Sequence, residues 1–477
     1  MSSMASNVRA KAPEARLVVA ELVARARAAQ KGYERYTQAQ VDEVVTAVGW
    51  AIMEPERNRS LAEMGVRDTG LGDVQDKIQK NHRKTLGLLR DLREAKSVGI
   101  IAEYPERGLV EIARPVGVVA AITPSTNPAA TVANKIANSL KGRNAVIVAP
   151  SPKGLSTCQA LVGYVHAELN KVGAPLDLVQ HLPAPVTKEL THELMQQADL
   201  VVATGSQNNV RAAYASGTPA FGVGAGNVAV IIDASADLAD AAKKIAASKC
   251  FDNATSCSSE NSVVILDQVY RAALSALSEA GGVLLNEEEK RCLQATMWPE
   301  GKLSTSVTAQ SAAKIAQLAG LQRTEVAKAE FLMVEETGAG PEYPFSGEKL
   351  SPVLTVYRAP HFDYACGIVQ RIYGFQGAGH SVGIHTRDDD HIMRLGLELP
   401  VCRVIVNQAH CFANGGNFDN GLPFSLSMGC GTWGRNNFSD NLNYRHYLNI
   451  TRIARTIPES VPGEEEIFGD YFRKFGR

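Results

Sequence analysis

The stretch VGVVAAI at residues 116–122 decides the fold, because it is a continuous apolar run in which β-branched residues recur. A strand that is apolar at every position, rather than at every second one, is typical of a sheet buried on both faces. A helical pattern follows at residues 128–141, and a second such run, NAVIVA, at 144–149. This strand–helix–strand succession predicts parallel strands covered by helices.

The same alternation continues toward the C-terminus. The further predicted elements are helix 154–172, strand 177–182, helix 187–196, strand 199–203, helix 206–216 and strand 227–232. We therefore expect an α/β protein whose first large unit is a doubly wound sheet. Such sheets bind nucleotides at the carboxyl ends of their strands.

The regions on either side of this alternation carry patterns of their own. Apolar residues at helical spacing predict amphipathic helices at 13–31, 38–65 and 72–95, the last with Arg and Lys on its polar side, and a polar turn between apolar runs predicts a hairpin at 98–114. A second α/β region starts near residue 248, with predicted strands 262–266, 353–357 and 403–407 and helices 268–281, 286–295 and 309–319. The tail after Pro458 is interpreted as a solvated surface segment.

Composition excludes several classes of protein. The 477 residues include 49 Lys plus Arg against 50 Asp plus Glu, so the net charge of -1 gives no electrostatic reason to bind nucleic acid or an anionic membrane. No apolar run approaches the ~18 residues that span a bilayer, and the first residues lack the apolar core of a secretory signal. The eight cysteines form no CxxC and no Cys/His cluster with zinc-finger spacing, so we expect a reduced, cytoplasmic protein without a metal site.

A phosphate site is expected where a strand leads directly into a helix. Thr204-Gly205-Ser206 follows strand 199–203 and opens a helix, whose free N–H groups would point at an anion. The alternative interpretation is an ordinary turn in which Ser206 caps the helix. The glycine-rich run at 222–227 has the wrong spacing for GxGxxG and leads into a strand instead.

One cysteine stands in a loop suited to chemistry. Cys257 lies in FDNATSCSSEN at 251–261, among small polar residues whose N–H groups lower a thiol pKa when they face it. Cys411, beside His410, is a second loop candidate. A Cys–His protease needs a positioned imidazole, and from the residues alone the ten histidines leave that alternative open.

Several motifs, in their order and spacing, carry a resemblance to a known family. They are RPVGV at 114–118, ITPSTNP at 122–128, GVGAGN at 222–227, FDNATSCSSE at 251–260, EKLSP at 348–352, GAGH at 377–380 and LSMGCGTWG at 426–434. Over residues 10–455 the chain resembles the aldehyde dehydrogenase superfamily, and specifically its CoA-acylating branch. The resemblance implies a Rossmann-like cofactor domain without GxGxxG, an α/β catalytic domain and a small β arm for oligomerisation.

The resemblance also implies roles for individual residues. Cys257 would attack the aldehyde carbon, forming a thiohemiacetal and then a thioester, and Asn127 would join the Cys257 backbone N–H in the oxyanion hole. Glu348 matches the glutamate that holds the nicotinamide ribose. The full set of residues expected at the NAD(P) site is Thr123, Pro124, Ser151, Lys153, Thr204, Gly205, Ser206, Gly224 and Glu348.

Two departures from the hydrolytic members of this family are informative. Those members place a water-activating glutamate at the position matched by Gly222, so the thioester here is expected to wait for the thiol of coenzyme A. They also place a glutamate near the adenosine ribose, whereas the matching run, APSPK at 149–153, ends on Lys153 with no carboxylate. We therefore expect NADP to be accepted as well as NAD, with NADP preference as a hypothesis.

The substrate pocket is expected to be polar and cationic, with Arg403 preceding its loop. Its expected lining residues are Ser125, Thr126, Ser256, Ser258, His410 and Arg435. Such a pocket suits a small anionic aldehyde, and sulfoacetaldehyde is the leading hypothesis, with acetaldehyde or propionaldehyde as the alternative. A hydrolytic aldehyde dehydrogenase and a catalytically silent binding relative are the rival functions.

The family also implies a division of the chain. We expect an NAD(P)-binding domain at 1–247, including the oligomerisation hairpin 98–114, a catalytic domain at 248–430, and a C-terminal return with an oligomerisation strand and tail at 431–477. A homodimer or homotetramer follows, because exposed strand edges need a partner.

Overall fold

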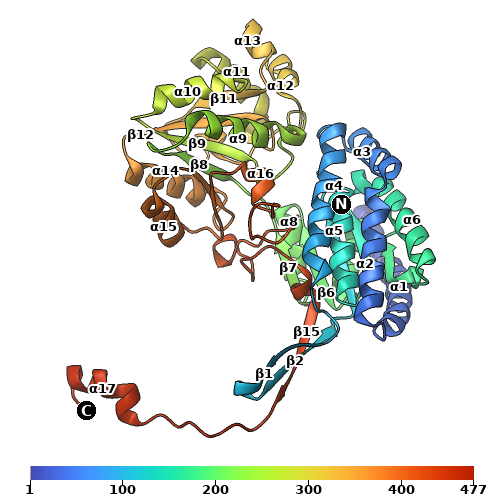
Figure 1. Cartoon of the computed structure of the whole chain (residues 1–477). Coiled ribbons are helices and arrows are strands. Elements are labelled where there is room, and N and C mark those ends of the chain that lie inside the picture. Colours follow the sequence, from blue (N-terminus) through green and yellow to red (C-terminus); the bar gives the residue numbers. More distant parts are fainter. Residues whose placement is uncertain (1) are drawn as a thin grey trace.

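The computed structural model describes residues 2–477, with side chains from residue 13 onward, and contains three sheets (Figure 1). The first sheet is parallel throughout and has the order β5-β4-β3-β6-β7. Its strands are β3 (Val118–Thr123), β4 (Ala145–Pro150), β5 (Val179–His181), β6 (Leu200–Thr204) and β7 (Ala220–Val223). Every residue of β3 and β4 is buried, as their continuous apolar runs predicted.

Helices cover this sheet, and their side chains form one core with the strands. They are α1 (Ser2–Tyr33), α2 (Gln38–Met53), α3 (Pro55–Thr69), α4 (Val74–Arg93), α5 (Ala130–Lys141), α6 (Leu155–Lys171), α7 (Lys188–Gln197) and α8 (Gln207–Tyr214). The single helix predicted at 38–65 is two helices. The chain breaks at Glu54, whose carboxylate caps the next helix, and Pro55 occupies its first position.

The second sheet is also parallel, with the order β10-β11-β12-β9-β8-β13-β14. Its strands are β8 (Val228–Ile232), β9 (Glu260–Leu266), β10 (Gly282–Leu284), β11 (Phe331–Glu335), β12 (Val353–Ala359), β13 (Val382–His385) and β14 (Val404–Val406). Its helices are α9 (Leu238–Cys250), α10 (Tyr270–Glu279), α11 (Glu287–Met297), α12 (Ala312–Leu318), α13 (Thr324–Ala327), α14 (Phe362–Phe375), α15 (Asp389–Glu398) and α16 (His410–Ala413). Alternate residues of β8 pack toward opposite faces, Ile231 with α14 and Ile232 with α9.

The predicted domain limit at residue 247 is wrong with respect to β8. That strand pairs with β9 and β13 in the second sheet, so the chain leaves the first sheet after β7. Both sheets are parallel and each has apolar central strands, so nothing in the local pattern of residues 228–232 says which sheet they join.

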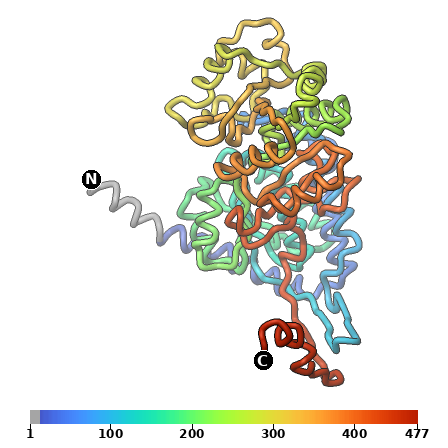
Figure 2. The backbone as a smooth tube through the Cα atoms, turned by 90° about the vertical axis from the view of Figure 1, so that its left-hand side faces the viewer, coloured from blue at the N-terminus to red at the C-terminus, as the bar shows by residue number. Residues whose placement is uncertain are grey.

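The third sheet is a small arm with the order β1-β2-β15. The predicted hairpin is confirmed as β1 (Gly99–Tyr104) and β2 (Leu109–Pro115), and β15 (Leu448–Ala454) pairs antiparallel with β2. Beyond β15 the chain runs away from the body as an extended segment and ends in α17 (Glu464–Phe475) (Figures 1 and 2). The predicted surface tail is therefore exposed, but it contains a helix.

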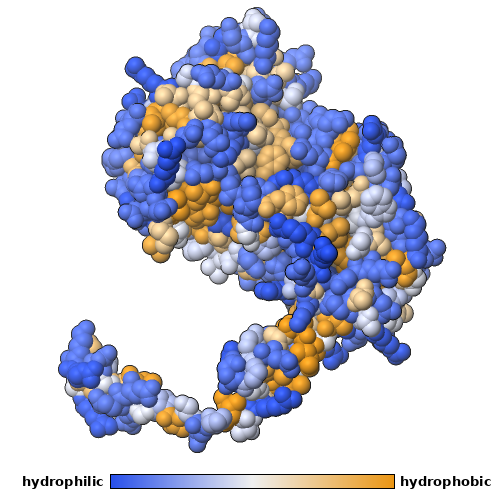
Figure 3. Space-filling model, viewed as in Figure 1, coloured by the Kyte–Doolittle hydropathy of each residue, from blue (hydrophilic) through white to orange (hydrophobic). Residues whose placement is uncertain are grey.

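No helix in the described part of the chain combines the length and the apolar character that crossing a bilayer requires. Apolar patches do gather on the arm and along the body (Figure 3), and the side chains of Ile467, Tyr471 and Phe475 on α17 are exposed.

Candidate active site

The loop that carries Cys257 begins with a turn of unusual backbone geometry. Asp252, Asn253 and Ala254 all adopt positive φ, at 52°, 49° and 58°. Three consecutive non-glycine residues in the left-handed region are held only where their surroundings stabilise them. The turn connects α9 to β9 and places Cys257 between them.

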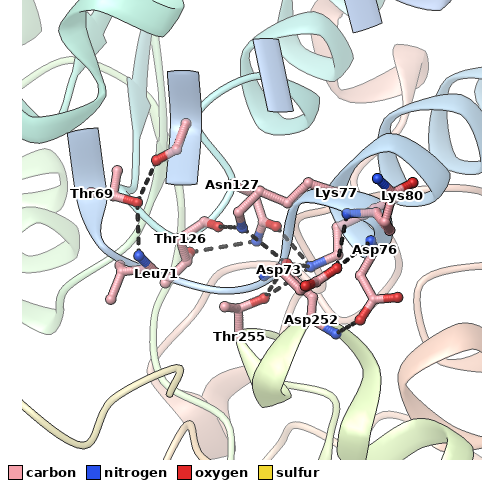
Figure 4. A network of polar contacts seen from close by, with 12 residues as sticks. Thr69, Leu71, Asp73, Asp76, Lys77, Lys80, Thr126, Asn127, Asp252 and Thr255 are labelled. Atoms are coloured by element: carbon pink, nitrogen blue, oxygen red, sulfur yellow. Dashed lines mark hydrogen bonds and ion pairs between the residues drawn. The ribbon is translucent and has the colours of Figure 1, made fainter. Parts of the chain in front are cut away.

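Asp252 anchors this turn through a buried network with α4 (Figure 4). Its carboxylate accepts hydrogen bonds from Lys77 Nζ at 3.0 Å, from Lys80 Nζ, from Thr255 Oγ1 at 2.6 Å and from the backbone N of Asp73 at 2.8 Å. Burial by itself raises the pKa of Asp252, but the two lysine ammonium groups outweigh it and hold the pKa below its ordinary value. The nucleophile loop is thus bonded to the first domain through charged groups.

The same lysine orients Asn127. Lys80 Nζ donates to Asn127 Oδ1 at 3.0 Å, so the oxygen end of the amide is occupied. The Nδ2 end is left as the donor, which is the end an oxyanion requires. The structure thereby supplies a physical reason for the role that the sequence assigned to Asn127.

Cys257 is half-buried against the glycine-rich loop that follows β7. A Cβ added at Gly226 would lie 2.3 Å from the Cys257 carbonyl oxygen, so glycine is required there. The backbone N of Gly226 donates to Glu348 Oε1 at 3.1 Å. Burial is the main cause that raises the pKa of Cys257 to about 12, and the nearby Glu348 carboxylate adds to it.

This raised pKa has a measurable consequence. Because the thiolate fraction grows with pH below the pKa, we expect alkylation of Cys257 by iodoacetamide to accelerate about tenfold per pH unit from pH 7 to 10. Peptide mass spectrometry separates Cys257 from Cys292, which is exposed. A rate that reaches a plateau below pH 9 would show that the free enzyme stabilises the thiolate instead.

A pocket at the carboxyl ends of β3, β4 and β6 matches the expected cofactor site. It is lined by Thr123, Ser151 and Ser206 of the predicted set, together with residues of α7 and α8. Thr123 Oγ1 is buried without a hydrogen-bond partner, so an acceptor or donor from a ligand would satisfy it. Ser206 also caps α8 by accepting from the backbone N of Asn209, which confirms the alternative interpretation of Thr204-Gly205-Ser206 without excluding a phosphate role.

The other predicted cofactor residues lie around this pocket without lining it. Lys153 is exposed, Thr204 shares a hydrogen bond with Ser427, and Pro124 contacts Gly205. Gly224 packs against Gln207 of α8. Their roles in cofactor binding stay predictions.

A carboxylate does lie in the pocket expected for the cofactor, contrary to the prediction from the sequence. Residues 149–153 carry no acid, yet Glu189 of α7 lines the same pocket, beside Lys188. The matched run of sequence covers only the loop after β4, whereas the fold brings α7 to the same place.

The fold leaves no room for a side chain at Gly222. A Cβ at Gly222 would point against α8, 2.7 Å from Val210 Cγ1, and Tyr214 OH bonds both the N–H and the C=O of Gly222. A glutamate side chain at this position would therefore collide with α8. The conclusion rests instead on the whole segment 222–226, GVGAG, which offers no titratable side chain.

A second pocket lies beside the loop that carries Cys257. Of the predicted substrate residues it contains Ser256, whereas Ser125 and Thr126 are half-buried outside its lining, and Ser258 is buried with its Oγ accepting from Asn414 Nδ2. The prediction that His410 lines the substrate pocket is wrong: His410 is fully buried and pairs with Ser381 Oγ at 2.9 Å. The sequence of a loop does not show which of its side chains are buried beneath it.

Arg403 and Arg435, which were also expected near the substrate, lie outside the pocket lining. Arg403 is buried and uses all its nitrogens on Asn414 Oδ1, Asn441 Oδ1 and three backbone carbonyls, which makes it a structural clamp. Arg435 is exposed at the end of a short 3-10 helix, Thr432–Gly434, and is not part of the pocket lining.

The sequence missed the cations that do line this pocket. They are Lys80, Arg83 and Lys84 of α4. In the sequence they look like the polar side of an amphipathic helix, but Lys77, Lys80 and Lys84 are buried. Their spacing of three and four residues on one helix was a signal of a shared face, though not of its burial.

Two parallel sheets, a pocket at the carboxyl ends of β3, β4 and β6, and a loop cysteine whose neighbour Ser256 lines a pocket with the oriented amide of Asn127 are typical of an oxidoreductase that uses a cysteine nucleophile. The aldehyde dehydrogenase family model matches residues 5–326, and the chain belongs to that family. It is 66% identical over 459 residues to the acylating sulfoacetaldehyde dehydrogenase of Cupriavidus necator, covering 96% of this chain and 93% of that protein. It is 40% identical to the acetylating succinate-semialdehyde dehydrogenase of Clostridium kluyveri, covering 94% and 99%.

Solved structures agree with this assignment. The acetylating aldehyde dehydrogenase of Geobacillus thermoglucosidasius superposes with a TM-score of 0.90 at 36% identity, covering 95% of this chain and 99% of that one. The aldehyde dehydrogenase fold expected from the sequence is thereby confirmed.

Proposed function

We propose that the protein is a CoA-acylating aldehyde dehydrogenase, which converts an aldehyde, coenzyme A and NAD(P)+ to an acyl-CoA and NAD(P)H. The observations that carry this proposal are the Lys80-oriented amide of Asn127, which lines one pocket with Ser256 next to Cys257, and the loop at 222–226 without a base. The relatives named above are acylating or acetylating enzymes, which supports the same reaction.

The proposed reaction has two stages, formation of a thioester on Cys257 and its transfer to coenzyme A. Cys257 Sγ attacks the aldehyde carbon, and Asn127 Nδ2 receives the oxygen that becomes negative, which lowers the barrier by roughly 3 kcal/mol. A nicotinamide cofactor bound at the pocket of Thr123 and Ser206 supplies a hydride acceptor. Loss of a hydride from the thiohemiacetal carbon to that acceptor would leave a thioester on Cys257, with the carbonyl oxygen still facing Asn127.

The second stage needs a nucleophile. The segment 222–226 has no group to deprotonate water, so the thioester persists until the thiol of coenzyme A attacks it. Cys257 then leaves as the thiol. Its raised pKa, about 12, fits a group that returns to the protonated form in the free enzyme.

Cofactor choice is proposed from charge. Lys188 lines the pocket and Lys153 follows the lining residue Pro152, so a 2′-phosphate has cations to meet, with Glu189 in the same lining. We infer that both NAD and NADP are used, and the ratio of kcat/KM for the two cofactors decides the preference.

The substrate is proposed to be sulfoacetaldehyde. Two of the relatives act, by their names, on aldehydes that carry an anionic group, sulfoacetaldehyde and succinate semialdehyde. The cationic pocket of Lys80, Arg83 and Lys84 suits that class better than acetaldehyde or propionaldehyde.

A substrate panel tests this proposal. Sulfoacetaldehyde, succinate semialdehyde, acetaldehyde and propionaldehyde are each incubated with coenzyme A and NAD or NADP, and the thioester product is identified by mass spectrometry. We expect sulfoacetyl-CoA to form with a kcat/KM at least about tenfold above the uncharged aldehydes, or 1.4 kcal/mol. A free acid as the main product would contradict the acylating reaction, and a preference for propionaldehyde would contradict the substrate.

We infer that two or four copies associate through the arm. The outer edge of β1 and the side chains of α17 are exposed, and unpaired strand edges are normally covered in native assemblies. Sedimentation of the full chain against a chain ending at residue 446 measures the contribution of the arm to association.

The eight described cysteines are all unpaired, which fits a cytoplasmic enzyme.

A further inference from the structure

The lining of the pocket beside Cys257 contains three cationic side chains and no carboxylate. Lys80, Arg83 and Lys84 line it from one face of α4, opposite Phe251, Phe412, Leu426 and the nucleophile loop. The cavity itself is small, about 30 Å³, within about 360 Å³ of space between atoms that includes open solvent. Asn127 and Ser256 lie in the same lining, so the pocket adjoins the reacting atoms.

The three cations differ in the hydrogen-bond donors that they have left for a ligand. An ammonium group has three N–H bonds, and Lys80 Nζ already donates to Asn127 Oδ1, Asp252 Oδ2 and Thr255 Oγ1. Lys80 therefore has no donor left for a ligand. Its charge is also paired with Asp252.

Arg83 is different. Its guanidinium lies 5.3 Å from the ring centres of both Phe412 and Phe418, and Nη2 donates to Asn417 Oδ1. Its Nε is buried and has no hydrogen-bond partner, and within the part of the chain described with side chains Arg83 forms no ion pair. A buried unpartnered donor on a charged group is costly, so it indicates a site that an acceptor completes.

Lys84 supports the same site. Its Nζ donates to the carbonyl oxygens of Gly415 at 3.0 Å and Gly416 at 3.4 Å, which leaves one N–H. Neither partner is a carboxylate, so the charge of Lys84 is not balanced by an ion pair. Arg83 and Lys84 are adjacent, and together they offer a planar fork and a point charge.

We propose that Arg83, assisted by Lys84, binds the anionic group of the aldehyde substrate, a sulfonate or a carboxylate, while the aldehyde oxygen meets Asn127. This inference rests on the proposed acylating function and adds the residues that select an anionic substrate. The oxygens of a sulfonate accept from the fork of an arginine, and such charge-assisted bonds are the strong ones. Arg83 and Lys84 of α4 thus take the substrate-binding role that was expected from the sequence for His410 and Arg435.

The test replaces Arg83 with methionine, which keeps the apolar length of the side chain and removes its donors. We expect the ratio of kcat/KM for sulfoacetaldehyde over propionaldehyde to fall about 100-fold, since hydrogen bonds to charged groups are among the more costly to lose. Arg93→Met, on the exposed end of the same helix, is the matched control and is expected to keep the wild-type ratio. Arg83→Lys is expected to recover part of it.

A binding measurement is made alongside the kinetics. Ethanesulfonate, which has the anion but no aldehyde, is expected to slow alkylation of Cys257 in the wild type and not in Arg83→Met. If both aldehydes lose activity equally, or the KM for coenzyme A rises with either aldehyde, Arg83 serves the CoA phosphates and the proposal is overturned. If the wild type itself fails to prefer sulfoacetaldehyde, while ethanesulfonate still protects through Arg83, the substrate proposal fails and the anion site stands.

Loss of folding is distinguishable from loss of recognition. Thermal unfolding of Arg83→Met is compared with that of Arg93→Met and the wild type. Protection by ethanesulfonate that persists in a folded Arg83→Met protein contradicts the assignment, whatever the kinetic outcome.

Discussion

Replacement of Cys257 by alanine is expected to lower the steady-state rate at least about 10⁴-fold, or roughly 5 kcal/mol of barrier. The reason is that the proposed path is covalent: without the sulfur there is no thiohemiacetal, and the oriented Asn127 has no oxyanion to stabilise. The measurement is NAD(P)H formation with sulfoacetaldehyde and coenzyme A, together with circular dichroism to confirm folding. Cys292→Ala, at an exposed cysteine outside the site, is the matched control and should keep wild-type activity. More than about 1% residual activity in a folded Cys257→Ala protein would rule out Cys257 as the nucleophile.

Omission of coenzyme A is expected to stop the reaction after a single turnover. We expect one NAD(P)H per active site in a rapid burst, followed by a steady rate at least about 100-fold below that with coenzyme A, because general base catalysis of hydrolysis contributes at least that factor. The physical reason is the absence of a titratable group in the segment 222–226, which lies against the nucleophile through Gly226.

Stopped-flow absorbance measures the burst, and intact-protein mass spectrometry locates the acyl group on Cys257. Adding coenzyme A to the stalled enzyme should release the acyl group as a thioester and restore turnover. The Cys257→Ala protein serves as the control without a burst. Sustained turnover without coenzyme A would instead assign the chain to hydrolytic chemistry.

The sequence was most informative where one local property controlled the structure. The apolar runs at 116–122 and 144–149 have no polar face, which predicts central strands, and the strands that they form, β3 and β4, are fully buried in the first sheet. The hairpin at 98–114 was visible because a polar turn separates two apolar runs, and β1 and β2 pair as expected. In these segments the pattern and the final position have the same cause, which is the burial of apolar surface.

The sequence was least informative where position depends on a distant segment. The strand at 228–232 has the same apolar pattern as its neighbours but joins the second sheet, since the choice is made by β9 and β13 on either side of it. Histidine 410 precedes a polar loop, yet it packs beneath it against Ser381. Glu189 was absent from the cofactor argument because it comes from a helix near the pocket and not from the matched loop.

The sequence by itself determined the chemistry of this protein: an α/β fold, a loop thiol at Cys257, an amide at Asn127 and no carboxylate in the run 222–226. Only the tertiary structure decided how those groups are held and what surrounds them. It placed α4 against the loop of Cys257, so that Lys80 Nζ bonds Asn127 Oδ1 and Arg83 lines the pocket beside that loop. The reason is that a lysine or arginine on a helix is a solvated charge until another domain covers it, and the covering domain lies more than a hundred residues further along the chain.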